Sequence, residues 1–125
     1  RYNSDGSLDT TFNSTGIVIT PVSPCDDYAY ALAIQSDGKL VTAGNSNDST
    51  TGCTYITNNF ALVRYNSNGS LDNSFGSSGI VKTSFLNDSA SAFALAIQSD
   101  GKIVAAGAAR PGTTLDDFAI VRYWP

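Results

Sequence analysis

The sequence predicts an all-β protein of two four-stranded antiparallel sheets, and three observations carry this prediction. The composition favours turns and strands over helices, because the 125 residues include no Met or Glu and are rich in Gly, Asn, Ser and Thr. Nearly the whole chain is an internal repeat. Each copy contains an Asp-Gly pair between two apolar runs, which is typical of a tight β-hairpin.

The repeat is visible over most of the chain. Residues 1–44 align with residues 64–107 without a gap, with 27 identities. A loop that is five residues longer in the first copy follows, and both copies then end on a similar apolar run closed by Arg-Tyr. We therefore expect a first repeat at 1–63, a second at 64–121, and the start of a third copy at 122–125.

Each copy is expected to form four short strands. In the first copy these are residues 16–20, 30–35, 39–44 and 60–65, and in the second they are residues 79–83, 93–98, 102–107 and 118–123. In the first strand, Ile19 of one copy is replaced by Lys82 in the other. That face of the strand should therefore lie near solvent in at least one copy.

The second strand of each copy is apolar on both faces. In the first copy Ala31 and Ala33 alternate with Leu32 and Ile34. A strand that is apolar on both sides is typical of the interior of a layered structure. We therefore expect this strand to be enclosed by further sheets.

Four antiparallel strands in each repeat of about 60 residues are the pattern of a propeller blade. The two copies share Arg-Tyr-Asn runs, Phe-x3-Gly spacings and Ala-Leu-Ala-Ile-Gln-Ser-Asp-Gly-Lys runs, at residues 1–9, 12–16, 31–39, 64–72, 75–79 and 94–102. In these motifs the chain resembles the delta-60 repeat family, which occurs in tandem in bacterial surface and secreted proteins. The resemblance implies a propeller-like β architecture and carries over no catalytic residues.

Two blades alone would leave two large apolar faces in water, so neighbouring copies are expected to complete the stack. Both ends of the chain carry the Arg-Tyr pair that closes the last strand of each copy, so the end of one chain lies at the point of the repeat where another chain begins. A head-to-tail contact of this kind either closes into a ring or grows into a fibre. The alternative is that these two repeats are an excerpt of a longer tandem protein.

The two cysteines are expected to form a disulfide. Cys25 and Cys53 lie in loops at the same end of the first predicted blade, and the second copy lacks both, with Asp88 in place of Cys25. A disulfide would indicate an oxidising, extracellular or cell-surface location. Two free thiols remain the alternative, and a metal site is disfavoured because His is absent.

Several further residues are candidate sites. Asn3, Asp5 and Asp9 resemble part of a calcium loop, although Asx side chains that hold a turn explain the same pattern. Tyr55, in the longer loop of the first copy, is a candidate for recognising a glycan or a protein. Four Asn-x-Ser/Thr sequences are candidate glycosylation sites, at Asn13, Asn47, Asn68 and Asn87.

Two arginines at the end of the last strand are expected to have a structural role. Arg64 and Arg122 are placed to pair with Asp9, Asp72 or carbonyls in the turns. Binding of an anion is the alternative function of these side chains.

Charge and composition exclude several classes of function. A net charge of −4 argues against a nucleic-acid surface, and no apolar run is long enough for membrane insertion. Without His, general base catalysis by histidine is excluded. We expect no enzyme activity and no cofactor. The expected function is that of an extracellular structural protein assembling with copies of itself, or alternatively a binding module for carbohydrate or protein.

Overall fold

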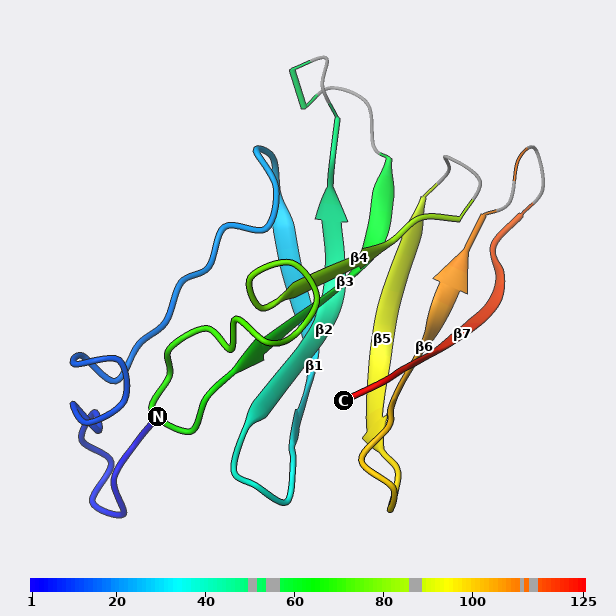
Figure 1. Ribbon diagram of the computed structural model, residues 1–125. Coiled ribbons are helices and arrows are strands. Elements are labelled where there is room, and N and C mark those ends of the chain that lie inside the picture. The colour runs from blue at the N-terminus through cyan, green and yellow to red at the C-terminus, as the bar shows by residue number, and fades with distance from the viewer. Residues whose placement is uncertain (50–51, 54–56, 86–88, 111, 113–114) are drawn as a thin grey trace.

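The computed structural model of the chain describes residues 1–49, 52–53, 57–85, 89–110, 112 and 115–125. These residues contain no helix and form two antiparallel sheets that lie side by side (Figure 1). The first sheet has the strand order β1-β2-β3-β4 and the second the order β5-β6-β7. The strands are β1 (Asp27–Ile34), β2 (Leu40–Asn47), β3 (Asn58–Tyr65), β4 (Ile80–Thr83), β5 (Ala90–Ile97), β6 (Ile103–Ala109) and β7 (Asp117–Tyr123).

The outermost strand of the first sheet comes from the second repeat. After β3, residues 66–79 form a loop that brings β4 back antiparallel to β3, with Leu62 opposite Val81. The expectation that residues 16–20 form the first strand of their own blade is wrong, because this segment belongs to neither sheet. The boundaries of the sheets therefore do not coincide with the boundaries of the repeats, because the last strand of the first sheet belongs to the second repeat. In the described residues the second sheet has three strands rather than the expected four.

The two hairpins have the expected turn. Residues 35–39 join β1 to β2, where the Gln35 amide donates to the Lys39 carbonyl at 2.8 Å and Gly38 has a φ of +82°. The corresponding turn before β6 has Gly101 at +83°. A positive φ costs a side-chain-bearing residue free energy and costs glycine little, which explains the repeated Asp-Gly.

A β-bulge interrupts the first strand of each hairpin. The β1–β2 register shifts between Ala29 and Ala31, and the β5–β6 register shifts between Ala92 and Ala94. The bulge brings the Tyr28 carbonyl oxygen so close to the facing Gly44 that a Cβ there would lie 1.8 Å from it. This close approach explains why each copy has glycine at this position of its second hairpin strand.

The hydrophobic core lies between the two sheets. Val41, Phe60 and Leu62 of the first sheet are fully buried and belong to one cluster with Ala92 and Ile103 of the second. Several alanines of the second sheet are also fully or almost fully buried in this cluster. Alanine at the contact allows the two sheets to approach closely, as a stack of blades requires.

Within this chain, the strand predicted at 30–35 is covered on one side only in the first copy. The strand β1 is an edge strand, and Leu32 and Ile34 are 58% and 66% exposed. Their counterparts in the second copy, Leu95 and Ile97, are partly buried against the core. The difference in exposure arises because, of the two copies, only the second has another sheet packed against the face that carries these residues.

Candidate functional site

The candidate site consists of two outer sheet faces. We call the side of the second sheet turned away from the first the end face, formed by Val104, Ala106, Phe118, Ile120 and Arg122. The side of the first sheet turned away from the second is the start face, formed by Leu32, Ile34, Leu40, Thr42, Val63 and Tyr65. A groove of about 590 Å³ runs over the end face and one of about 340 Å³ over the start face.

Equivalent residues of the two repeats differ sharply in exposure. Phe60 is buried between the sheets, whereas its counterpart Phe118 on the end face is fully exposed. Leu62 is likewise 0% exposed and Ile120 is 72% exposed. The end face of the second sheet is therefore the same kind of surface that the first sheet buries against a neighbour.

The start face is partly covered by the extended segment 17–22. The Tyr65 hydroxyl donates to Thr20 Oγ1 at 2.8 Å, and Val18 and Val22 line the groove. A matching contact joins the two sheets, where the hydroxyls of Thr83 and Tyr123 lie 2.9 Å apart. Burial there raises the pKa of Tyr123 above its usual value. Segment 17–20 thus contacts β3 of the first sheet in the same way as β4 contacts β7 of the second sheet.

The end of β3 and the loop at residues 66–79 hold a buried ion pair beside the core between the sheets. Arg64 Nε donates to Asp72 Oδ2 at 2.8 Å, and Lys39 Nζ lies 3.1 Å from the same oxygen. Hydrogen bonds from Ser74, together with these two cations, hold the pKa of Asp72 well below its usual value. The Arg64 guanidinium also lies over the buried ring of Phe75 at 4.5 Å. The expected pairing of Arg64 with Asp72 is confirmed.

The loop at residues 1–16 repeats this geometry in a more exposed setting. Arg1 Nε donates to Asp9 Oδ2 at 2.6 Å, and Thr11 donates to the other carboxylate oxygen. The hydrogen bond from Thr11, followed by that from Arg1, lowers the pKa of Asp9 to about 2. The Ser7 amide and hydroxyl donate to Asp5 and lower its pKa also.

These contacts explain the pattern that resembles part of a calcium loop. The carboxylates of Asp5 and Asp9 hold their own turns, and the Asn3 side chain donates to Ser7 Oγ at 3.0 Å. In the part of the chain that the structure describes, no three acidic or cysteine side chains gather as metal ligands would. The geometry therefore favours the interpretation as Asx turns.

The two loops also contact each other. The Asn13 amide donates to the Asn68 carbonyl at 2.7 Å, and Arg1 Nη1 donates to the Ser67 carbonyl at 3.0 Å. Gly38 of the first hairpin lies against Ser67 as well. Successive repeats therefore meet through their loops in addition to their sheet faces.

At the end face, the corresponding cations do not share a buried carboxylate within the described part of the chain. Arg122, the counterpart of Arg64, is exposed and has no ion-pair partner among the described residues. Lys102, the counterpart of Lys39, pairs with Asp100 beside it and lies over the ring of Trp124. The expected pairing of Arg122 with Asp9, Asp72 or carbonyls in the turns is not found within the described residues. No role was predicted for either lysine from the sequence. The one indication was that Lys39 and Lys102 occupy the same position in the two repeats.

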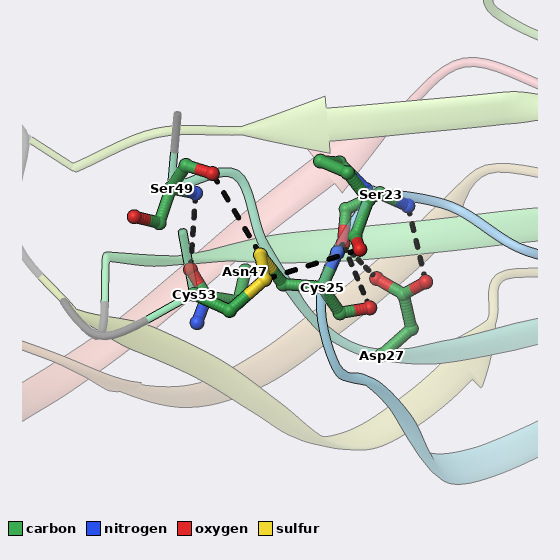
Figure 2. Close-up of a disulfide and its surroundings, with 7 residues drawn as sticks. Ser23, Cys25, Asp27, Asn47, Ser49 and Cys53 are labelled. Carbon is green, nitrogen blue, oxygen red and sulfur yellow. Dashed lines mark hydrogen bonds between the residues drawn. A yellow bond between two sulfur atoms is a disulfide. The ribbon is translucent and has the colours of Figure 1, made fainter. Parts of the chain in front are cut away.

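The disulfide between Cys25 and Cys53 is confirmed, with Cα atoms 5.5 Å apart (Figure 2). It joins the loop before β1 to the loop after β2. Asp27 organises the first of these loops, because its carboxylate accepts hydrogen bonds from the amides of Val22 and Ser23. The bridge therefore fixes the loop that continues from segment 17–22 to the first sheet.

The candidate glycosylation sites differ in accessibility. Asn13 and Asn68 are exposed in the two loops, whereas Asn47 is only 6% exposed and its Oδ1 accepts the Ser49 amide. Asn87 and the candidate recognition residue Tyr55 lie outside the described residues. Within those residues, no helix has the length and apolar character needed to cross a membrane.

Two stacked antiparallel sheets, with matching faces and a strand shared across the repeat boundary, define a β-propeller repeat protein. A family model described as "Domain of unknown function (DUF5122) beta-propeller" matches residues 1–12, 35–75 and 98–125, more than half of the chain. The chain belongs to this family. Searches of curated proteins and of solved structures give no match.

Proposed function

We propose that this protein is an extracellular structural protein that associates head to tail, with the end face of one copy against the start face of another. The proposal includes the narrower assignment of its repeats to the delta-60 type. It also includes growth into a fibre or closure into a ring, which the rotation between neighbouring sheets decides.

One observation carries the proposal: residues of identical repeat position are buried at the internal joint and exposed on the end face. Phe60 and Leu62 show what this surface packs against, because they lie on the small apolar residues of the following sheet. The start face carries the equivalents of those residues, such as Val63 for Val121, and Ala61, which lines the groove over this face, is the equivalent of Ala119. The two outer faces are thus complementary in the same way as the two inner ones.

The disulfide supports the extracellular location, because such bonds persist in oxidising compartments. The exposed Asn13 and Asn68 would be the sites of glycosylation in that setting, whereas Asn47 is buried in the folded chain. Recognition of a glycan or protein through the loops near the disulfide is the second candidate function. It rests on the longer loop of the first copy, which contains Tyr55.

Sedimentation velocity and electron microscopy of the purified chain over a range of concentrations test the proposal. We expect oligomers or fibres for the unmodified chain and monomers for Ile120→Asp, because a carboxylate would be buried without a partner in the joint. Leu115→Asp is the matched control, since Leu115 is 85% exposed but lies outside both faces, and it should assemble normally. A chain that remains monomeric at every concentration would contradict the proposal.

A further inference from the structure

We infer that assembly of this protein proceeds by strand donation: residues 17–20 of one copy pair with the free edge of β7 in another copy and complete its second sheet. The inference rests on the head-to-tail association proposed above and specifies how its joint is made. It concerns backbone pairing, whereas the proposed function concerns only the packing of faces.

The acceptor is the edge of β7. In the first sheet β3 is paired on both sides, with β2 and with β4. Its counterpart β7 pairs with β6 alone in the described part of the chain. A strand edge carries a row of backbone donors and acceptors, which form hydrogen bonds with another extended segment when one is available.

The donor is segment 17–20, the counterpart of β4. The two share the sequence Ile-Val-x-Thr, yet β4 belongs to a sheet and segment 17–20 forms no strand. The segment is already extended, and Ile19 is 89% exposed. Its preceding residue, Gly16, has a φ of +81°, as Gly79 before β4 has one of +92°.

The position of the donor on its own sheet agrees with this role. Thr20 contacts Tyr65 of β3 as Thr83 contacts Tyr123 of β7, with oxygen atoms 2.8 Å and 2.9 Å apart. Segment 17–20 is therefore held where the outermost strand of a preceding sheet would lie. A second copy docked on the start face would bring its β7 beside this segment.

The internal joint also fixes the register. Phe60 lies opposite Thr83 and Leu62 opposite Val81 in the β3–β4 pair. The same register places Phe118 of one copy opposite Thr20 of the next, and Ile120 opposite Val18. A shift of one residue would turn every side chain of the donor to the wrong face.

Cross-linking between two single-cysteine variants tests this register. Cys25 and Cys53 are bonded to each other, so an introduced cysteine is the free thiol in each variant. Val18→Cys and Ile120→Cys are mixed, oxidised with oxidised glutathione and separated on a non-reducing gel. We expect a covalent heterodimer, because directly opposite Cβ atoms in antiparallel strands lie about 5 Å apart. The pair Thr20→Cys and Phe118→Cys repeats the test should the first pair fold poorly.

The matched control is Ile19→Cys mixed with Ile120→Cys. Alternation along the strand directs residue 19 to the opposite face, so this pair should cross-link at least tenfold more slowly. Equal rates for the two mixtures, in samples that sediment as oligomers, would overturn strand donation and leave face-to-face assembly standing. A chain that sediments as a monomer at all concentrations would overturn both.

Discussion

The two Arg-Asp pairs place the same residues in different surroundings. The side chains of Arg64 and Asp72 are 5% and 8% exposed, whereas those of Arg1 and Asp9 are 42% and 17% exposed. Asp72 also receives Lys39 from the neighbouring hairpin, which Asp9 lacks among the described residues. The difference arises because one loop lies in a completed joint and the other at an outer face.

This difference leads to a prediction about pH. The pKa of Asp72 is lower in the folded chain than in the unfolded chain, so the unfolded chain binds more protons in acid. The contribution of Asp72 to stability is therefore present above its unfolded pKa of about 3.9. It is lost as the pH falls toward the folded-state pKa. We expect the free energy of unfolding, measured by urea titration and circular dichroism, to fall between about pH 5 and pH 2. Asp72→Asn should lower stability at pH 7 and flatten this dependence.

Asp26→Asn is the control for removing one negative charge, because Asp26 is exposed and its side chain makes no contact of this kind among the described residues. It should keep the pH dependence of the unmodified chain. If Asp72→Asn keeps the same dependence as well, the buried ion pair does not contribute to acid stability.

At the scale of the element, the bulged hairpins depend on one glycine each. A Cβ on Gly44 would lie 1.8 Å from the Tyr28 oxygen, and one on Gly107 would lie 1.9 Å from the Ser91 oxygen. These contacts are with backbone atoms, which cannot turn away as a flexible side chain can. Opening the bulge would in turn shift the register of every residue beyond it.

We therefore expect Gly44→Ala to destabilise the chain by at least about 2 kcal/mol in urea unfolding. Gly6→Ala serves as the comparison, because Gly6 has a φ of +85° with open space around the added methyl group. It should cost about 1 kcal/mol, the price of a left-handed backbone alone. Equal losses for the two variants would show that the close approach at Gly44 is relieved without cost.

The disulfide is also tested at this scale. The double variant Cys25→Ser with Cys53→Ser should lose about 3.5 kcal/mol of stability, because the bridge spans 28 residues and restricts the unfolded chain. A reducing agent should destabilise the unmodified chain by a similar amount and leave the double variant unchanged. An unmodified chain that is insensitive to reduction after full unfolding would contradict this account of the bridge.

The local features of these elements were predictable from the sequence, and their assignment to sheets was not. The Asp-Gly turns, the strands around 30–35 and 39–44, and the pairing of Cys25 with Cys53 follow from turn chemistry and from comparison of the copies. The pairing of β4 with β3 does not, because a repeat shows which residues are equivalent and not which copy supplies a neighbour. For the same reason, the sequence does not show that the exposed strand is the one in the first copy, which carries Leu32 and Ile34.

At the scale of the whole molecule, the chain resembles a section through a longer stack. Each inner surface is matched to its neighbour, and each outer surface presents the residues that the inner ones bury, as Ile120 does for Leu62. Two sheets of this size bury one apolar interface between them, so a large part of the available stabilisation depends on further contacts.

Thermal stability should consequently depend on protein concentration. A tenfold rise in concentration above the dissociation constant adds about 1.4 kcal/mol to the folded state, which raises the melting temperature by about 5 °C in a chain of this size. Calorimetry of the unmodified chain and of Leu115→Asp should show this rise. Ile120→Asp should melt at the same temperature at every concentration, and a rise in this variant would show that association occurs elsewhere.

The offset between repeat and sheet has a consequence for how such a protein can change in length. Because β4 completes a sheet begun by the preceding repeat, each unit closes the sheet before it and leaves an edge for the strand of the unit after it. Duplication of one unit therefore supplies both an open edge and the strand that closes the preceding one. Arrays of this design can thus be lengthened one blade at a time, with every existing junction preserved.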